Sequence, residues 1–203
     1  MRDEGGAGED RGLRDLLLIP NLLTLSRFLA AALVPLCFLA TDRAAAEIAA
    51  LSLFLYASVT DFADGYLARR LNQTSAIGAQ LDTLADKALL TATLAALCLS
   101  QYSAAPWFWI GSGLIVAREL GVTLLRRWRR GASGLKVTMA AKWKTTVQMV
   151  SVALLLGAGV VAGYAGPAVG NALETLGIAL FGLAVWLTLS TGYAYLRAAL
   201  AEG

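Results

Sequence analysis

Four aspartates stand close together in an otherwise apolar part of the chain: Asp61, Asp64, Asp82 and Asp86. The first two are three residues apart and the last two are four apart, so in helices each pair shares one face. Carboxylates are the ligands that Mg²⁺ and Mn²⁺ prefer, and the chain has no histidine to serve as a softer ligand or a general base. The pattern predicts metal-assisted chemistry at phosphorus, with two divalent ions bridging a diphosphate.

Four negative charges at the edge of an apolar segment would repel one another and would be costly to remove from water. Bound divalent cations are one form of compensation. Two others remain open at this point: buried ion pairs with Arg69, Arg70 and Lys87, and a pathway for protons or sodium ions. The three interpretations differ in what should surround the carboxylates.

Small residues and a cation accompany the aspartates. Gly65 and Ala68 lie on or beside the face of the first pair, and Gly78 precedes Asp82 by about one turn. Small side chains there let a bulky planar ligand, or a facing helix, approach the backbone closely. Arg69, about one turn beyond the first pair, suits hydrogen bonding to a phosphate. These neighbours favour a metal-bound phosphate ligand.

The elements that must position these residues follow from composition. The chain has 203 residues, of which 58% are hydrophobic and 15% charged, against about 45–50% and about 25% in soluble domains. The apolar residues form runs of membrane-spanning length at about 22–40, 45–70, 77–100, 107–126, 137–163 and 171–196. We therefore expect an all-α polytopic membrane protein with six transmembrane helices within residues 19–200. Residues 1–18 should form a flexible cytoplasmic tail, in which leucines 13–18 could make a short interfacial turn.

Lysines and arginines predict the orientation. The loops after the first, third and fifth spans hold only Arg43, whereas the amino-terminal tail, the other two loops and the carboxyl end hold most of the rest. Both termini and the aspartates should therefore face the cytoplasm. The cluster Arg126, Arg127, Arg129 and Arg130 adjoins a span, where it suits topology and anionic lipid headgroups. Nucleic acid is not expected as a partner.

The spacing resembles the signature of a known family. It reads Asp61-Phe-Ala-Asp64-Gly65-Tyr-Leu-Ala68-Arg69, then eight residues before Gly78, with Asp82 and Asp86 following at four-residue intervals. All eight fixed positions match the CDP-alcohol phosphotransferases, and the six-span pattern agrees with that family's fold. The resemblance implies a homodimer in a bacterial inner (cell) membrane, with an active site open to the cytoplasm. CDP-diacylglycerol would be the donor.

The resemblance also implies roles for single residues. Metal ions, Mg²⁺ or Mn²⁺ and two in number, would be held by all four aspartates: Asp61, Asp64, Asp82 and Asp86. The CDP moiety would be held by Asp61, Gly65, Ala68, Arg69, Gly78 and Asp82. Asp86 would also be the catalytic general base, taking the proton of the acceptor hydroxyl as it attacks phosphorus.

Three other stretches resemble the phosphatidylglycerophosphate synthases of the family, which use glycerol 3-phosphate as the acceptor. They are Ile19–Arg27, which places Asn21, Thr24 and Arg27 at the rim of the active site, Ala117–Glu119 and Ala141–Gln148. Arg118 lies well inside an apolar span, where a lone cation is costly and suggests a function. An ion pair with Glu119 or an aspartate is the alternative. The predicted binding site for the acceptor's phosphate comprises Arg118, Lys136, Lys142 and Lys144.

Other acceptors and another class of protein remain as alternatives. Within the family, the acceptor could be phosphatidylglycerol, as in a cardiolipin synthase, or an inositol phosphate. Outside the family, intramembrane aspartates also occur in ion-coupled transporters. A transporter would leave the spacing of Gly65, Ala68 and Arg69 without an explanation.

Overall fold

A computed structural model describes the backbone of residues 19–71, 76–128 and 139–201, and the side chains of 22–61, 78, 81–124 and 143–193. These residues form helices and no strands, in the order α2 (Ile19–Cys37), α3 (Arg43–Leu71), α4 (Ala76–Leu99), α5 (Pro106–Trp128), α6 (Met139–Ala165) and α7 (Pro167–Ala201). The all-helical prediction is confirmed. The boundaries agree closely with the predicted segments except in α7, which is longer at both ends. The predicted tail and its interfacial turn lie outside the described residues.

Three segments of the described chain are long and apolar enough to cross a membrane: Arg43–Asp61, Trp143–Ala165 and Pro167–Tyr193. The apolar stretch of α2 is shorter, at Leu22–Cys37. Charged residues interrupt the two remaining helices, α4 with Asp82, Asp86 and Lys87 and α5 with Arg118 and Glu119. Length and composition therefore identify three membrane-crossing helices.

Large apolar side chains cover the outside of the helices. Leu29 is 62% exposed, Leu124 65% and Trp186 63%. An outer surface of this kind would be unfavourable in water but is what acyl chains solvate. Together with the apolar helices, it makes the chain a membrane protein.

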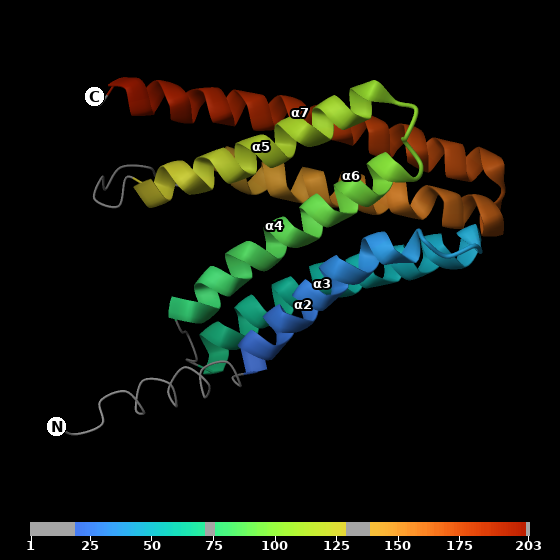
Figure 1. The fold of residues 1–203 in the computed structure, drawn as a ribbon, viewed down its shortest axis with the longest axis horizontal. Helices are drawn as coiled ribbons and strands as arrows, with labels where there is room; N and C mark the ends of the chain where they lie inside the picture. The colour runs from blue at the N-terminus through green and yellow to red at the C-terminus, as the bar shows by residue number, and fades with distance from the viewer. Residues whose placement is uncertain (1–18, 72–75, 129–138, 202–203) are drawn as a thin grey trace.

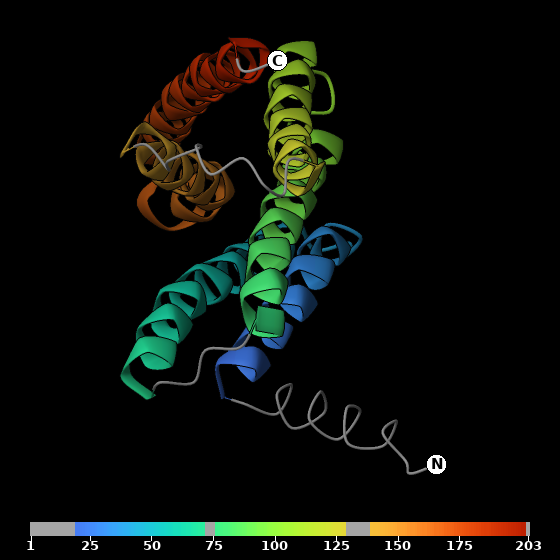
Figure 2. The same ribbon diagram turned by 90° about the vertical axis from the view of Figure 1, so that its left-hand side faces the viewer.

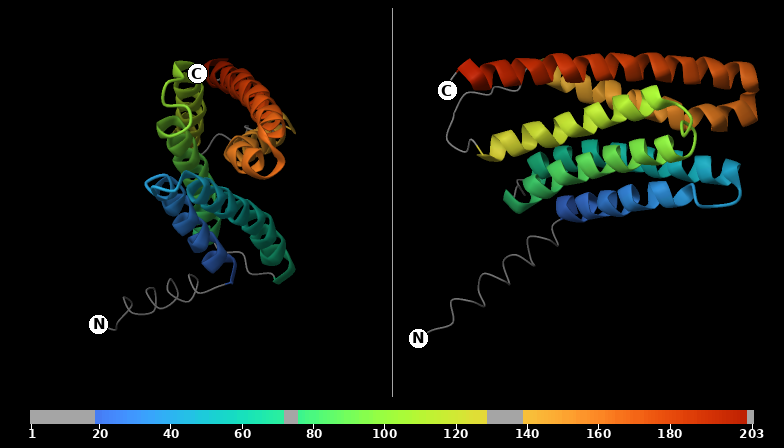
Figure 3. Two further views of the ribbon diagram at one scale, coloured as in Figure 1. Left: turned by 90° about the vertical axis from the view of Figure 1, so that its right-hand side faces the viewer. Right: turned by 45° about the horizontal axis from the view of Figure 1, so that its top comes forward.

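The six helices run roughly along one direction and alternate in sense (Figure 1). α2 packs against both α3 and α4, and α6 packs along α7. Contacts of α3 with α6 join these two groups directly, and α5 joins them through its contacts with α4 and α7. Figure 2 and the left panel of Figure 3 show the arrangement from opposite ends of the bundle. The amino ends of α2, α4 and α6 therefore lie at the same end of the bundle as the carboxyl ends of α3, α5 and α7.

A single residue, Gly166, separates α6 from α7. Its φ of 92° is in the left-handed region, and its N–H donates to the carbonyl of Ala162 at 3.1 Å. Glycine adopts this conformation without steric cost and commonly ends helices in this way. Pro167 follows as the first residue of α7, where its fixed φ is favourable and its missing N–H costs nothing. These two residues form the tight antiparallel connection.

We expect Gly166→Ala to destabilise the protein by about 1 kcal/mol, since a side chain in the left-handed region costs about that much. Thermal unfolding in detergent should shift down by about 2–4 °C. Nothing lies within 4 Å of a Cβ added at Gly166, so a loss of stability would come from the strained backbone conformation and not from a steric contact. Gly163→Ala is the matched control, because its added Cβ is equally free but its backbone is helical. Equal melting temperatures for the two variants would contradict the backbone explanation.

Stacked aromatic rings hold α5 against α7 at the end of the bundle where α5 begins. The ring of Phe108 lies between those of Tyr102 and Phe181, at centroid distances of 4.4 and 4.5 Å. Gly111 lets the two helices approach, since a Cβ there would lie 2.7 Å from Phe181. The contact fixes the register of α5 along α7.

Candidate active site

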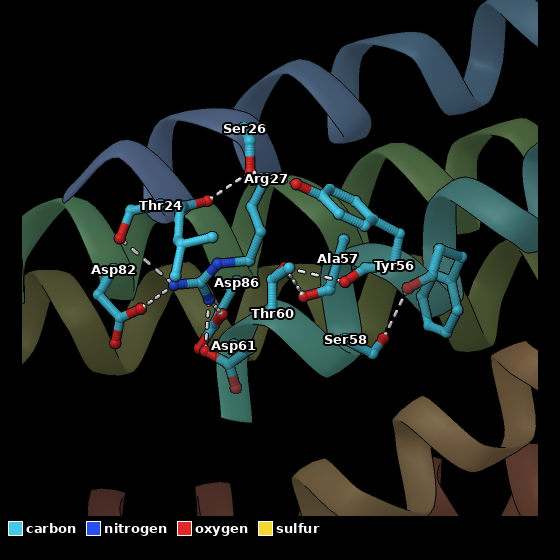
Figure 4. Close-up of polar contacts among 12 residues, drawn as sticks. Thr24, Ser26, Arg27, Tyr56, Ala57, Ser58, Thr60, Asp61, Asp82 and Asp86 are labelled. Carbon is cyan, nitrogen blue, oxygen red and sulfur yellow. Dashed lines mark hydrogen bonds and ion pairs between the residues drawn. The ribbon is translucent and has the colours of Figure 1, made fainter. Parts of the chain in front are cut away.

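The guanidinium group of Arg27, on α2, lies among three of the four signature carboxylates (Figure 4). Nη1 donates to Oδ1 of Asp61 and, at 2.8 Å, to Oδ1 of Asp86. Nη2 donates to Oδ1 of Asp82 and lies 3.4 Å from the hydroxyl of Thr24. The three carboxylates come from two helices, α3 and α4, and a third helix supplies the cation that they share.

Burial gives this cluster an inner and an outer side. The side chain of Arg27 is 1% exposed, whereas those of Asp61, Asp82 and Asp86 are 37%, 43% and 39% exposed. Each carboxylate offers an oxygen within 4.8 Å of the other two. Three hard oxygen ligands this close together, accessible from one side and without sulfur or nitrogen donors among them, fit Mg²⁺ or Mn²⁺.

The packing of α2 explains why Arg27 points inward. Its buried face carries Thr24, Arg27, Ala31 and Val34, at helical spacing. Leu22, Leu25, Leu29, Leu33 and Leu36 are more exposed and occupy the rest of the helix surface. We predicted Arg27 at the rim of the site, and the structure places it in the centre of the carboxylates. In the sequence, Arg27 lies on the side of the helix opposite the leucines, and this signal could have indicated that its side chain points inward.

A second polar cluster joins α5 to α6 and α7. Glu119 accepts from Lys144, and its Oε1 atom also lies 3.2 Å from Nη1 of Arg118. Nη2 of Arg118 donates to Thr191 at 3.2 Å. Lys144 is 2% exposed, so this carboxylate compensates a deeply placed cation. The ion pair between Arg118 and Glu119, left open as an alternative, is therefore present, and it includes Lys144 as well.

A cavity of about 150 Å³ lies between the two clusters. Asp86 and Glu119 both line it. The other lining residues are Thr83, Lys87, Leu90, Thr145, Gln148 and Met149. Lys87 donates to Thr123 at 2.5 Å and Gln148 to Thr188 at 3.1 Å, so both side chains have defined positions. A small polar molecule in this cavity would contact Asp86 directly.

The structure thus brings Asp61, Asp82 and Asp86 together and gathers Arg118 and Lys144 around Glu119. Gly78 is buried in α4. The remaining predicted site residues, or their side chains, lie outside the described part of the chain: Asn21, Asp64, Gly65, Ala68, Arg69, Lys136 and Lys142. Sequence reasoning did not assign a role to Gln148 or Thr83, which carry no charge, although Gln148 ends the stretch Ala141–Gln148 and Thr83 lies at a variable position of the signature.

A sequence model of the CDP-alcohol phosphatidyltransferases matches residues 17–191. The chain belongs to this family. The matched region includes Arg27, the signature from Asp61 to Asp86, and both Arg118 and Lys144. CDP-alcohol phosphatidyltransferases are enzymes and in general depend on divalent metal ions, for which the acidic cluster is suited. Family membership confirms the resemblance seen in the sequence and removes the reason to consider an ion-coupled transporter.

Similar members of the CDP-alcohol phosphatidyltransferase family bear the name CDP-diacylglycerol–glycerol-3-phosphate 3-phosphatidyltransferase. The protein of Cereibacter sphaeroides is 42% identical over 90% of this chain and 95% of its own length. That of Escherichia coli is 37% identical over 91% of this chain and 96% of its own. A chloroplastic and mitochondrial protein of Arabidopsis thaliana is 36% identical over 70% of this chain and 51% of its own length.

Proposed function

We propose that this chain transfers the phosphatidyl group of CDP-diacylglycerol to glycerol 3-phosphate, giving phosphatidylglycerophosphate and CMP for phospholipid biosynthesis. The names of relatives that match nearly the whole chain support the two substrates. The observation that supports the mechanism is the cavity lined by both Asp86 and Glu119, the partner of Arg118 and Lys144. The proposed base thus lines the same small volume as the carboxylate that pairs with the two cations.

The carboxylate cluster would hold the donor. Asp61, Asp64, Asp82 and Asp86 would bind divalent ions, Mg²⁺ or Mn²⁺ and two in number. When bound, such ions supply positive charge to the diphosphate and to the oxygen of the leaving CMP. The CDP group would be oriented by residues of α3 and α4, namely Asp61, Gly65, Ala68, Arg69, Gly78 and Asp82.

The acceptor would lie in the cavity. Its phosphate would bind Arg118 and Lys144, with Lys136 and Lys142 adding positive charge from the same part of the sequence. Its hydroxyl would face Asp86, which takes the proton as the oxygen attacks the lipid-side phosphorus. The bond from that phosphorus to the CMP oxygen breaks in the same displacement. Binding the phosphate away from the hydroxyl holds the attacking oxygen in line.

The membrane arrangement is part of the proposal. All six helices would cross the bilayer, with the charges of α4 and α5 facing the protein interior or the aqueous end of the site. Both termini and the active site would face the cytoplasm, as the lysines and arginines outside the spans indicate. The functional unit would be a homodimer in a bacterial cell membrane.

Purified protein with CDP-diacylglycerol and a panel of acceptors tests the proposed reaction. We expect CMP release with glycerol 3-phosphate, and background release with phosphatidylglycerol or an inositol phosphate. EDTA should stop the reaction, and Mg²⁺ or Mn²⁺ should restore it. CMP formed only with phosphatidylglycerol would reassign the chain as a cardiolipin synthase. Full activity in EDTA would contradict the metal role of the aspartates.

A further inference from the structure

Arg27 contacts the same carboxylates that are proposed to bind the metal ions. Its two terminal nitrogens reach Oδ1 of Asp61, Asp82 and Asp86, and its side chain is almost completely buried behind them. Figure 4 shows the guanidinium between the carboxylates of the two helices. The oxygens that would ligate an ion are thus the acceptors of an internal cation.

An ion at the centre of the three carboxylates would need the same Oδ1 atoms that accept from Arg27. A Mg²⁺ ligand oxygen lies about 2.0–2.1 Å from the ion, so an ion among these carboxylates would occupy the space of the Arg27 nitrogens. Two cations at contact distance also repel each other strongly when one of them is buried. Ion binding at this central position therefore requires that the hydrogen bonds of Arg27 to the Oδ1 atoms be broken, whereas ligation through the second oxygen of each carboxylate would leave them in place.

We propose that Arg27 is an internal competitor for the metal site: its guanidinium neutralises the carboxylates and is displaced when divalent ions bind. Arg27 would then lower the metal affinity well below that of the aspartates alone. While no ion is bound, its charge would reduce the repulsion between the carboxylates. The hydroxyl of Thr24, 3.4 Å from Nη2, is a neighbouring acceptor on the same helix. This inference rests on the proposed function, in which the aspartates are metal ligands.

The competing explanation is that Arg27 permanently orients the carboxylates and so assists metal binding. The two explanations predict opposite changes when the guanidinium is removed. A competitor weakens metal binding, so its removal strengthens it. An orienting residue strengthens metal binding, so its removal weakens it.

Mn²⁺ titration of the purified protein without substrate, followed by calorimetry, separates them. We expect Arg27→Gln to bind Mn²⁺ about tenfold more tightly than wild type. In EDTA the same variant should melt at a lower temperature, because its carboxylates lack a counter-ion, and Mn²⁺ should raise its melting temperature more than that of wild type. Arg43→Gln is the matched control: Arg43 pairs with Glu47 at 3.0 Å near the other end of α3. It should leave Mn²⁺ affinity unchanged.

Arg27→Lys provides a second variant in case Arg27→Gln does not fold. A lysine keeps the charge but cannot reach three carboxylates with a planar fork, so its Mn²⁺ affinity should lie between those of wild type and Arg27→Gln. Unchanged or weaker Mn²⁺ binding in both variants, with normal binding by wild type, would overturn the competition alone. Failure of wild type to bind Mn²⁺ would overturn the metal site of the proposed function and this inference with it.

Discussion

Asp86→Asn should lower kcat by about a thousandfold or more, which is the largest effect we expect from a single substitution in this chain. The variant loses the group that would take the acceptor's proton, a contribution of about 10²–10⁴, and one of the charged ligands of the proposed ions. The amide oxygen of asparagine can still accept the 2.8 Å hydrogen bond from Arg27. The loss should therefore appear in CMP release and not in the yield of folded protein extracted from the membrane.

Asp42→Asn is the matched control for this prediction. Asp42 precedes α3 at the end far from Asp61, where its carboxylate accepts from the N–H of Ala45 at 3.2 Å. Asparagine serves equally well in that position, so activity and melting temperature should both be preserved. Turnover by Asp86→Asn within a few-fold of wild type would rule Asp86 out as the base.

Lys144→Gln should raise the KM for glycerol 3-phosphate by about ten- to a hundredfold. A hydrogen bond between charged groups contributes about 1.5–3 kcal/mol, and each 1.4 kcal/mol corresponds to about a factor of ten in affinity. Glu119 keeps Arg118 as a partner at 3.2 Å, so the carboxylate is not left without compensation. The KM for CDP-diacylglycerol should stay the same, because that substrate is assigned to the carboxylate cluster.

Steady-state kinetics with each substrate varied in turn measure the two KM values separately. Arg43→Gln again serves as the control, since it removes a cation paired with a glutamate, at a place where the cation is 70% exposed. A parallel rise in both KM values would indicate general structural damage to the site. An unchanged KM for glycerol 3-phosphate would remove Lys144 from the acceptor pocket.

Much of the architecture follows from local sequence. The apolar runs predict the helices, because hydropathy acts within a single segment. The spacing of Asp82 and Asp86 predicts that they share a face of α4, and the short link between α3 and α4 predicts that Asp61 lies near them. Three of the four carboxylates do lie together.

The centre of the site was not predictable in the same way. Arg27 reaches the carboxylates because α2 packs into the angle between α3 and α4 with a definite rotation about its axis. That rotation is set by Ala30, Ala31 and Val34 in the shared core with Phe54 and Leu89, far apart in sequence. Likewise, Lys144 meets Glu119 only because α6 and α5 converge through their separate contacts with α7.

The stacked rings of Tyr102, Phe108 and Phe181 have a consequence for genetics. Gly111 and Arg118 are seven residues apart on α5, hence on one side of the helix and separated by about 10 Å, and they face α7 at Phe181 and Thr191. A bulkier residue at Gly111 would slide or tilt α5 and carry Arg118 away from its partners. A random loss-of-function screen should therefore return alleles at two levels along the bundle, one at the proposed reacting groups and one at these rings.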